Sequence, residues 1–87
     1  MKLIIVHRRL VKQIRKLPKA TIQAFKERRN LFLTDATNPL LNIHSLQGKF
    51  IGYKSFNVTA DIRVIYRELD TETIIFTQIG SHSELYT

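Results

Sequence analysis

The hydrophobic residues of this chain repeat with two different periods, and the change of period separates a helical first half from a strand-rich second half. A short run of Leu, Ile and Val at residues 3–6 predicts a buried strand. Two helices are predicted next, separated by Pro18, which stops the first and can open the second. Turn-forming residues at 35–39 end the second helix. The apolar stripes of the two helices are Leu10, Val11, Ile14 and Leu17, and Ile22, Phe25, Phe32 and Leu33.

Three strand-like runs fill the second half, at about residues 50–58, 62–69 and 73–79, with gaps between them short enough for hairpins. The segment 40–46 before them has no regular pattern and is interpreted as a loop that holds His44. In the middle run, two sets of residues alternate and so face opposite sides of the sheet. The apolar set, expected against the helices, is Ile62, Val64 and Tyr66, and the other set is Asp61, Arg63, Ile65 and Arg67.

These elements predict a small α+β fold with the order β-α-α-β-β-β and a short C-terminal turn. We expect an antiparallel sheet with the two N-terminal helices packed on one face. At 87 residues, the chain is expected to form a single domain, residues 1–87, with a real but small core. It lacks cysteine, which excludes disulfides, and its N-terminal apolar run is too short for a signal peptide or a membrane span. We therefore expect a cytoplasmic protein that does not enter a membrane.

The net charge of +7 is concentrated at the N-terminal end. Residues 1–30 carry ten of the fourteen Lys and Arg residues and a single acidic residue, Glu27. A basic field of this kind attracts polyanions by steering and by the release of counterions, which favours a nucleic-acid partner. The simpler alternative is a solvated helix face that serves solubility.

Few kinds of chemistry suit this composition. The glycines match no nucleotide-binding loop, no serine lies in a nucleophile-elbow context, and no paired-histidine helix motif for zinc is present. We therefore expect neither a metal nor another cofactor, and the histidines are the main groups that titrate near neutral pH. Cleavage of an RNA phosphodiester needs only a base for the 2′-hydroxyl, an acid for the leaving 5′-oxygen, and a cation for the phosphate.

Residues suited to these three tasks lie in the second half of the chain, at His44, Asp61, Arg63 and His82. Histidine transfers protons near neutral pH, and arginine presents a fixed fork of donors to a phosphate. Simpler roles are also open: His44 could be a loop hydrogen-bonder, Asp61 could start a strand, and Arg63 could be a sheet-surface residue.

The C-terminal segment is either a frayed end or part of a site. Gly80 ends an apolar run and would free the backbone to aim His82. Tyr86 could fold onto the core, or it could stack on a nucleic-acid base.

Three segments resemble the RelE/ParE superfamily of bacterial toxins, and within it the YafQ-type messenger-RNA interferases. They are residues 46–54 (LQGKFIGYK), 61–67 (DIRVIYR) and 80–86 (GSHSELY). The shared features are a histidine two residues before Leu-Gln-Gly, a strand ending in Ile-Tyr-Arg, and a Gly-Ser-His-x-x-Leu-aromatic ending. The likeness covers the chain in element order and is most specific from His44 to Tyr86.

This resemblance implies a toxin that cuts messenger RNA in the ribosomal A site without a metal, and that is held inactive by a cognate antitoxin wrapped around it. Oligomers would form only through the antitoxin complex. By position, His44, Asp61 and His82 match acid/base residues of the YafQ branch. Asp61 and His82 would form the proton-transfer pair, with His44 as a second acid/base or an orienting group. Arg63 would stabilise the charge on the phosphate, and Tyr86 matches the branch's terminal aromatic.

Three further residues, Lys49, Lys54 and Asn57, are expected to bind the substrate. Asn57 stands where the YafQ branch tends to carry a histidine, so it could hydrogen-bond the RNA but could not transfer a proton. Ile62 replaces an aromatic residue beside Asp61. The basic helices would hold ribosomal RNA or meet an acidic antitoxin segment that folds on binding.

Two alternatives remain open from the sequence. A gyrase-directed toxin of the same superfamily would act by protein–protein contact, and DNA damage signalling with intact messenger RNA would reveal it. A catalytically inactive relative would bind RNA or antitoxin through the basic helices in a salt-dependent way, without cleavage.

Overall fold

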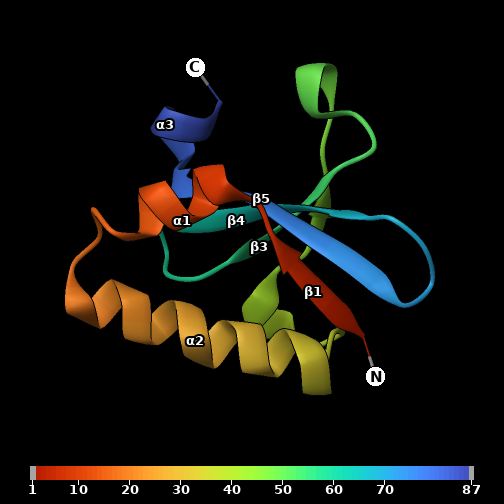
Figure 1. The fold of residues 1–87 in the computed structure, drawn as a ribbon, viewed down its shortest axis with the longest axis horizontal. Coiled ribbons are helices and arrows are strands. Elements are labelled where there is room, and N and C mark those ends of the chain that lie inside the picture. The colour runs from red at the N-terminus through yellow and green to blue at the C-terminus, as the bar shows by residue number, and fades with distance from the viewer. Residues whose placement is uncertain (1, 87) are drawn as a thin grey trace.

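A five-stranded sheet lies at the centre of the protein, whose computed structural model describes residues 2–86 (Figure 1). The strands lie in the order β1-β5-β4-β3-β2, and β1 is parallel to β5 while the other neighbours are antiparallel. In chain order they are β1 (Leu3–Val6), β2 (His44–Ser45), β3 (Lys54–Asn57), β4 (Ile62–Glu68) and β5 (Thr73–Ser81). The expected α+β class is confirmed, but the sheet is mixed rather than antiparallel, because β1 joins the edge of β5 in the same direction.

Two helices, α1 (Arg8–Ile14) and α2 (Lys19–Thr34), follow β1 as predicted. Pro18 occupies the N-cap position of α2, which agrees with its expected role between the helices. The long helix α2 covers one side of the sheet, whereas the C-terminal helix α3 (His82–Leu85) lies on the other side (Figure 1). No helix among residues 2–86 has both the length and the apolar character to cross a bilayer.

The segment between α2 and β4 differs most from the sequence prediction. The expected loop at residues 40–46 contains a 3-10 turn, η1 (Pro39–Leu41), and the short strand β2. The predicted strand at 50–58 is confined to β3, because a second 3-10 turn, η2 (Gly48–Phe50), interrupts it. Gly48 and Gly52 have φ angles of 63° and 89°, a left-handed conformation that ends an extended run and suits glycine.

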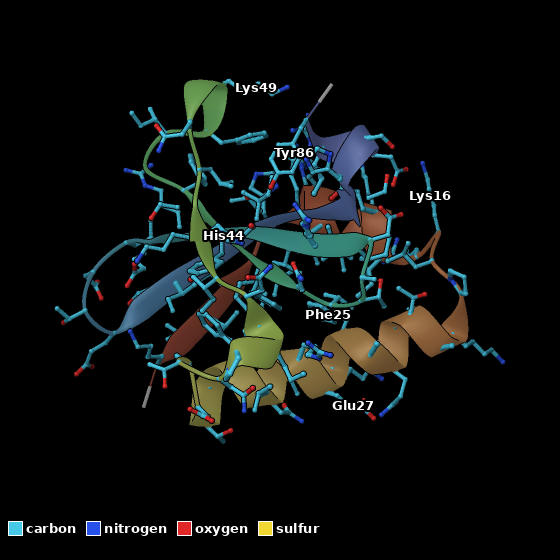
Figure 2. All side chains as sticks on the ribbon, turned by 180° about the vertical axis from the view of Figure 1, so that it is seen from behind. Lys16, Phe25, Glu27, His44, Lys49 and Tyr86 are labelled. Carbon is cyan, nitrogen blue, oxygen red and sulfur yellow. The ribbon has the colours of Figure 1, made fainter. Side chains whose placement is uncertain are left out.

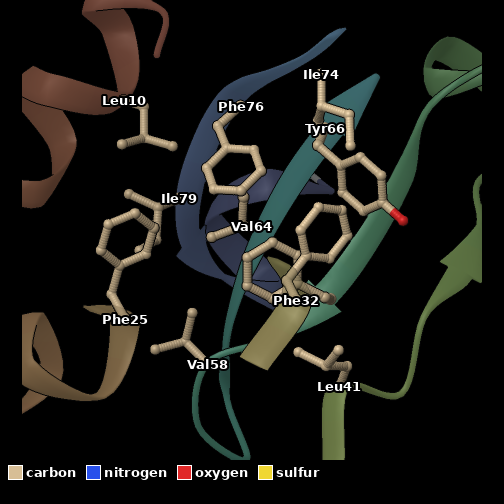
Figure 3. Packing of buried hydrophobic residues seen from close by; sticks show 11 residues of the cluster. Leu10, Phe25, Phe32, Leu41, Val58, Val64, Tyr66, Ile74, Phe76 and Ile79 are labelled. Carbon is tan, nitrogen blue, oxygen red and sulfur yellow. The ribbon is translucent and has the colours of Figure 1, made fainter. Parts of the chain in front are cut away.

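The core lies between the sheet and the two N-terminal helices (Figure 3). Phe32 of α2 is its centre: its ring lies 5.3 Å from that of Phe56, 5.0 Å from that of Tyr66 and 5.8 Å from that of Phe76. Leu10 brings α1 into the same cluster. These contacts explain why one sheet face and both helix stripes are apolar, since each side chain fills space between the others.

The prediction that Ile62, Val64 and Tyr66 face the helices is confirmed. Val64 and Tyr66 are buried in the core, and the half-buried Ile62 packs against it. The alternate residue Ile65, however, is also fully buried, although it faces the opposite side of the sheet. That second side is therefore partly covered as well.

A β-bulge in β5 changes which of its residues face the core. Tyr66 pairs with Phe76, but the preceding residue Ile65 pairs with Gln78, so Thr77 has no partner in the ladder. Its hydroxyl instead donates a 3.0 Å hydrogen bond to the Ile65 carbonyl. Because of the extra residue, Phe76 and Ile79 are both buried in the core, while Gln78 faces the other side.

Helix α1 packs against the edge of β5 at the point where the pairing with β1 ends. The last pair of the β1–β5 ladder joins Val6 to Phe76, so within residues 2–86 the next part of β5 has no strand on that side. The Gln13 side chain of α1 accepts a 2.8 Å hydrogen bond from the Ile79 backbone N–H there. A half-buried donor is thereby paired, which fixes α1 against the bulged part of β5.

We predict that Phe32→Ala destabilises the fold by about 3–5 kcal/mol, because it removes the ring that contacts three other aromatic side chains. The matched control is Leu33→Ala, at the next position of the same helix, where the side chain is 44% exposed. Urea denaturation followed by circular dichroism would measure both. Equal midpoints for the two variants would contradict the central position of Phe32.

Candidate active site

The side of the sheet opposite α2 carries two rows of residues, each running across neighbouring strands. The first row joins Asn57 of β3, Arg63 of β4 and Gly80 of β5. Paired residues of antiparallel strands point to the same face, so the Asn57 and Arg63 side chains lie next to each other. The second row consists of His44, Ser55, Ile65 and Gln78.

Helix α3 folds back over this face at Gly80. A Cβ atom at Gly80 would lie 3.4 Å from both the Leu85 Cδ2 and the Glu84 Oε1 atoms. Gly80 itself lies within β5 and pairs with Arg63, so the expectation that it frees the backbone to aim His82 was wrong. The glycine instead leaves space for the buried Leu85 side chain, which anchors α3 to the sheet.

A capping box fixes the start of α3 and therefore the position of His82. The Ser81 hydroxyl accepts a hydrogen bond from the Glu84 N–H at 3.2 Å, and the Glu84 carboxylate accepts one from the Ser81 N–H at 2.8 Å. The hydrogen bond from the Ser81 N–H to the carboxylate, with a smaller contribution from the Ser81 side chain, holds the pKa of Glu84 below its usual value. The C-terminal segment is thus helical from His82 to Leu85, with Tyr86 as the C-cap, and not a frayed end.

Aromatic contacts connect α3 with the η2 turn above this face of the sheet (Figure 2). The His82 and Tyr86 rings lie 4.7 Å apart, and Tyr86 meets Phe50 of η2 edge-on at 5.8 Å. Phe50 in turn lies 6.2 Å from Tyr53, whose ring also has the Arg67 guanidinium 5.8 Å away. The site is therefore bounded by the η2 turn on one side and by α3 on the other.

Three buried polar atoms of this region have no hydrogen-bond partner within residues 2–86: Asn57 Oδ1, Arg63 Nε and the Tyr86 hydroxyl. Leaving such a group unpaired costs about 1–3 kcal/mol, and more when it is charged. Unpaired buried groups are rare in folded proteins and mark places that a ligand or water completes. Here they offer an acceptor, a cationic donor and a hydroxyl, a combination that suits an anionic, hydrogen-bonding ligand.

The structure places Asp61 and His82 at one end of the site. The last pair of the β4–β5 ladder is Ile62 with Ser81, and Asp61 and His82 are the next residues beyond that pair. Both are exposed. The turn before Asp61 is held by Thr59, whose hydroxyl accepts hydrogen bonds from the N–H groups of Asp61 and Ile62 at 3.3 and 3.0 Å.

His44 lies further along the same face, towards the edge of the sheet. It is exposed on β2 and pairs with Ser55, so it is a diagonal neighbour of Asn57. Of the predicted acid/base residues, His44 is thus placed on the same face as Arg63 but near the opposite end from His82. Among residues 2–86, no three His, Cys, Asp or Glu side chains gather as metal ligands.

The two predicted substrate-binding lysines lie on different sides of the sheet. Lys49, on η2, has its ammonium group 5.3 Å from the Phe50 ring and lies beside the site. Lys54 pairs with Tyr66 on the helix-covered face, where its ammonium group forms a 2.7 Å ion pair with Glu68. That bond holds the pKa of Glu68 below its usual value. The structure therefore does not bring Lys54 to the site.

Sequence reasoning missed Phe50 and Tyr53, which help to bound the site, because both fell within a predicted strand. The signal that could have revealed them is the pair Gly48 and Gly52 on either side of Phe50. Glycines this close together are typical of a turn rather than of a strand.

Comparisons with known proteins agree with this geometry. The sequence profile described as a bacterial toxin of type II toxin–antitoxin systems, YafQ, matches residues 4–87. The fold is similar to YafQ from E. coli strain BL21(DE3), with a TM-score of 0.83, 20% identity and 100% of each chain covered. It is also similar to a chain of the archaeal RelE–RelB complex from Pyrococcus horikoshii OT3, with a TM-score of 0.71, 22% identity, and 92% of this chain and 93% of that chain covered.

A chain of the E. coli DinJ–YafQ toxin–antitoxin complex matches with a TM-score of 0.80 and 22% identity, over 99% of this chain and 98% of that chain. None of the curated protein sequences compared with the chain matches it. At these identities the solved structures establish the fold, while the sequence profile covers nearly the whole length. The chain therefore belongs to the YafQ family of bacterial toxins of type II toxin–antitoxin systems.

Proposed function

We propose that this toxin is an endoribonuclease that cuts messenger RNA on the ribosome by acid/base catalysis and so blocks translation. The observation that carries the proposal is the row of Asn57 and Arg63, with buried unpaired polar atoms, next to the end of the β4–β5 ladder, which Asp61 and His82 flank. A phosphodiester carries a negative charge and oxygen acceptors, which the unpaired donor of Arg63 could bind. Family membership agrees with this activity.

In the proposed reaction, the ribose 2′-oxygen attacks the adjacent phosphorus, and the bond from phosphorus to the 5′-oxygen breaks. Asp61, as a carboxylate, accepts the proton of the 2′-hydroxyl, because an ionised carboxyl group can only accept. His82 donates a proton to the leaving 5′-oxygen, a task for which imidazole is suited near neutral pH. His44 would act as a second acid/base or orienting group from β2.

The remaining side chains would bind the RNA. Arg63 faces the phosphate and stabilises the charge that builds on its oxygens. Asn57 hydrogen-bonds the RNA, and Lys49 adds positive charge at the η2 turn. Tyr86, already in contact with the His82 ring at 4.7 Å, offers its remaining surface to a base.

We also propose two macromolecular partners for the basic helices. Lys12 of α1, Lys16 of the turn between the two helices and Lys19 of α2 are exposed, so they could contact ribosomal RNA. By contrast, Arg28 donates to the Leu40 carbonyl, and Arg29 lies 6.0 Å from the Phe25 ring, so these two have structural roles. The ribosome places this activity in the cytoplasm.

An antitoxin is the second proposed partner. The similar E. coli and P. horikoshii chains were solved as DinJ–YafQ and RelE–RelB complexes, which supports a cognate antitoxin for this toxin too. An acidic antitoxin segment would cover the basic helices or the candidate active site, and larger assemblies would form through that complex.

We predict that His82→Ala lowers cleavage of a translated message by about 10²- to 10⁴-fold, the usual contribution of a general acid. Cells that express the variant without an antitoxin should then grow. The matched control is Ser83→Ala, at the next position of α3, which should stay toxic.

Growth curves at equal expression, together with toeprints of a translated message, would measure both variants. Undiminished toxicity of His82→Ala would contradict the proposed chemistry, and DNA damage with intact messenger RNA would indicate gyrase as the target.

Arg63→Lys should reduce the rate of cleavage by about 10- to 100-fold, because lysine keeps the charge but loses the fork of donors. Arg67→Lys is the matched control, since Arg67 lies on the same strand and the same face but at the exposed end near Tyr53. Single-turnover rates on programmed ribosomes would compare the two variants. Equal rates would show that the Arg63 guanidinium does not contact the reacting phosphate.

A further inference from the structure

A groove runs beside the candidate active site, between the start of α1, the η2 turn and β5. It consists of two adjoining cavities of about 260 and 410 Å³, which share Arg9, Lys49, Phe50 and Gln78 in their walls. Pockets for small ligands usually measure ~300–1,000 Å³, so the space is adequate for one. None of the predicted acid/base residues lines this α1–η2 groove, although Lys49 connects it with the site.

The charges in the α1–η2 groove are unevenly placed. Arg9 and Lys49 line both cavities, His7 lines the smaller one, and the carboxylate of Glu84 lines only the larger one. Arg9 is exposed and forms no ion pair within residues 2–86. Glu84 is held by the Ser81 N–H at 2.8 Å, and this bond keeps its pKa low. A phosphate is therefore favoured at the end with His7 and Arg9, away from Glu84.

Phe50 stands between the groove and a third cavity of about 470 Å³, which is lined by Gln47, Lys49, Phe50 and Tyr86. The half-buried Phe50 therefore borders both the groove and the third cavity, between its contacts with the Lys49 ammonium group and with Tyr86. An aromatic ring in this position can stack on a nucleic-acid base, and stacking tolerates any base because each has a flat face.

Gln78 provides a group that can distinguish bases. The β-bulge turns its side chain to this face, where it lines both cavities of the groove. Its amide makes no hydrogen bond with another described residue, so both its donor and its acceptor are available. An amide pairs with the edge of a base that presents a complementary donor and acceptor.

We propose that the α1–η2 groove binds the nucleotide next to the one that is cleaved, with its phosphate at Arg9, its base on Phe50 and the edge of that base at Gln78. This inference rests on the proposed function, because the groove adjoins the candidate active site only through the third cavity, which Tyr86 lines and which shares Lys49 and Phe50 with the groove. It gives the protein a second nucleotide subsite, outside the acid/base residues, that would contribute to sequence preference.

Binding can be tested separately from cleavage with a fluorescein-labelled RNA hexamer whose riboses are 2′-O-methylated, since this probe has no free 2′-hydroxyl. Fluorescence anisotropy would measure its affinity for the wild type and for the variants Arg9→Gln, Phe50→Leu and Gln78→Glu. The matched controls are Arg8→Gln, which makes the same charge change at the neighbouring position, and Ile51→Ala, whose exposed side chain follows η2. Neither control residue lines the groove.

We expect Phe50→Leu to weaken binding by about 5- to 100-fold, the range that one stacked base contributes. Arg9→Gln should weaken binding and reduce the dependence of log affinity on log salt by ~0.7, the value for one phosphate contact to a single strand. Gln78→Glu should change the preferred base at one position of the hexamer, because its carboxylate can only accept. The two controls should bind the hexamer within about twofold of the wild type, as surface changes away from a contact usually do.

Equal losses in Arg8→Gln and Arg9→Gln, an unchanged affinity in Phe50→Leu, or no binding of the hexamer by the wild type would overturn the subsite. Cleavage on translating ribosomes separates this failure from that of the proposed function. Variants of the groove that cut with wild-type rate and sequence preference, while His82→Ala does not cut, would reject the subsite alone. Groove-dependent binding of the hexamer by a wild type that cuts no message would retain the subsite and reject the cleavage.

Discussion

The β-bulge at Thr77 is the feature on which the rest of the site depends. A regular strand with period two cannot place Phe76 and Ile79 on one face, since three positions separate them. The extra residue, Thr77, allows Phe76 and Ile79 both to pack in the core. It also turns Gln78 and Gly80 to the opposite face. With a regular strand that kept Phe76 in the core, Ile79 would leave the core and Gly80 would turn towards the helices. Bulges often occur next to active sites, where they re-aim a side chain in this way.

The position of α3 follows from the bulge. Once Gly80 faces away from the helices, the Leu85 side chain can pack over it, and the capping box of Ser81 and Glu84 holds the first turn of the helix. Tyr86 then contacts Phe50 of the η2 turn edge-on, so α3 and η2 together bound the site. The result is a face with three buried polar atoms that have no partner within residues 2–86, namely Asn57 Oδ1, Arg63 Nε and the Tyr86 hydroxyl, and a bound phosphodiester would offset their cost.

Much of this could be predicted from the sequence, because the periodic pattern is strong where one face is buried. The two helices, Pro18 between them, and the core-facing set on β4 all follow from it. The parallel pairing of β1 could not, since a run of four apolar residues contains no information about its neighbour. The bulge could not either, because Thr77 resembles any other strand residue and only the packing of Phe76 and Ile79 together reveals it.

The sequence likewise predicted the site only where residues on regular strands form it, and not where separate elements meet. The strand register places Arg63 and Asn57 in one row, and Asp61 and His82 each follow the last pair of the β4–β5 ladder. Lys54 pairs with Tyr66 instead and faces the helices, because it lies three positions from Asn57 on β3 and successive strand residues face opposite sides. Phe50, Gln78 and Arg9 come together through a turn, a bulge and a helix start, and no single-sequence pattern links three such elements.

The chemical ends of the cut message test the proposed reaction most directly. Attack by the ribose 2′-oxygen, with Asp61 as base and His82 as acid, leaves a 2′,3′-cyclic phosphate, or its hydrolysis product, on one fragment and a 5′-hydroxyl on the other. Mass spectrometry of fragments released from translating ribosomes by the wild-type toxin should find these ends. A 3′-hydroxyl paired with a 5′-phosphate would mean that water attacks the phosphorus, and would contradict the roles assigned to the two residues.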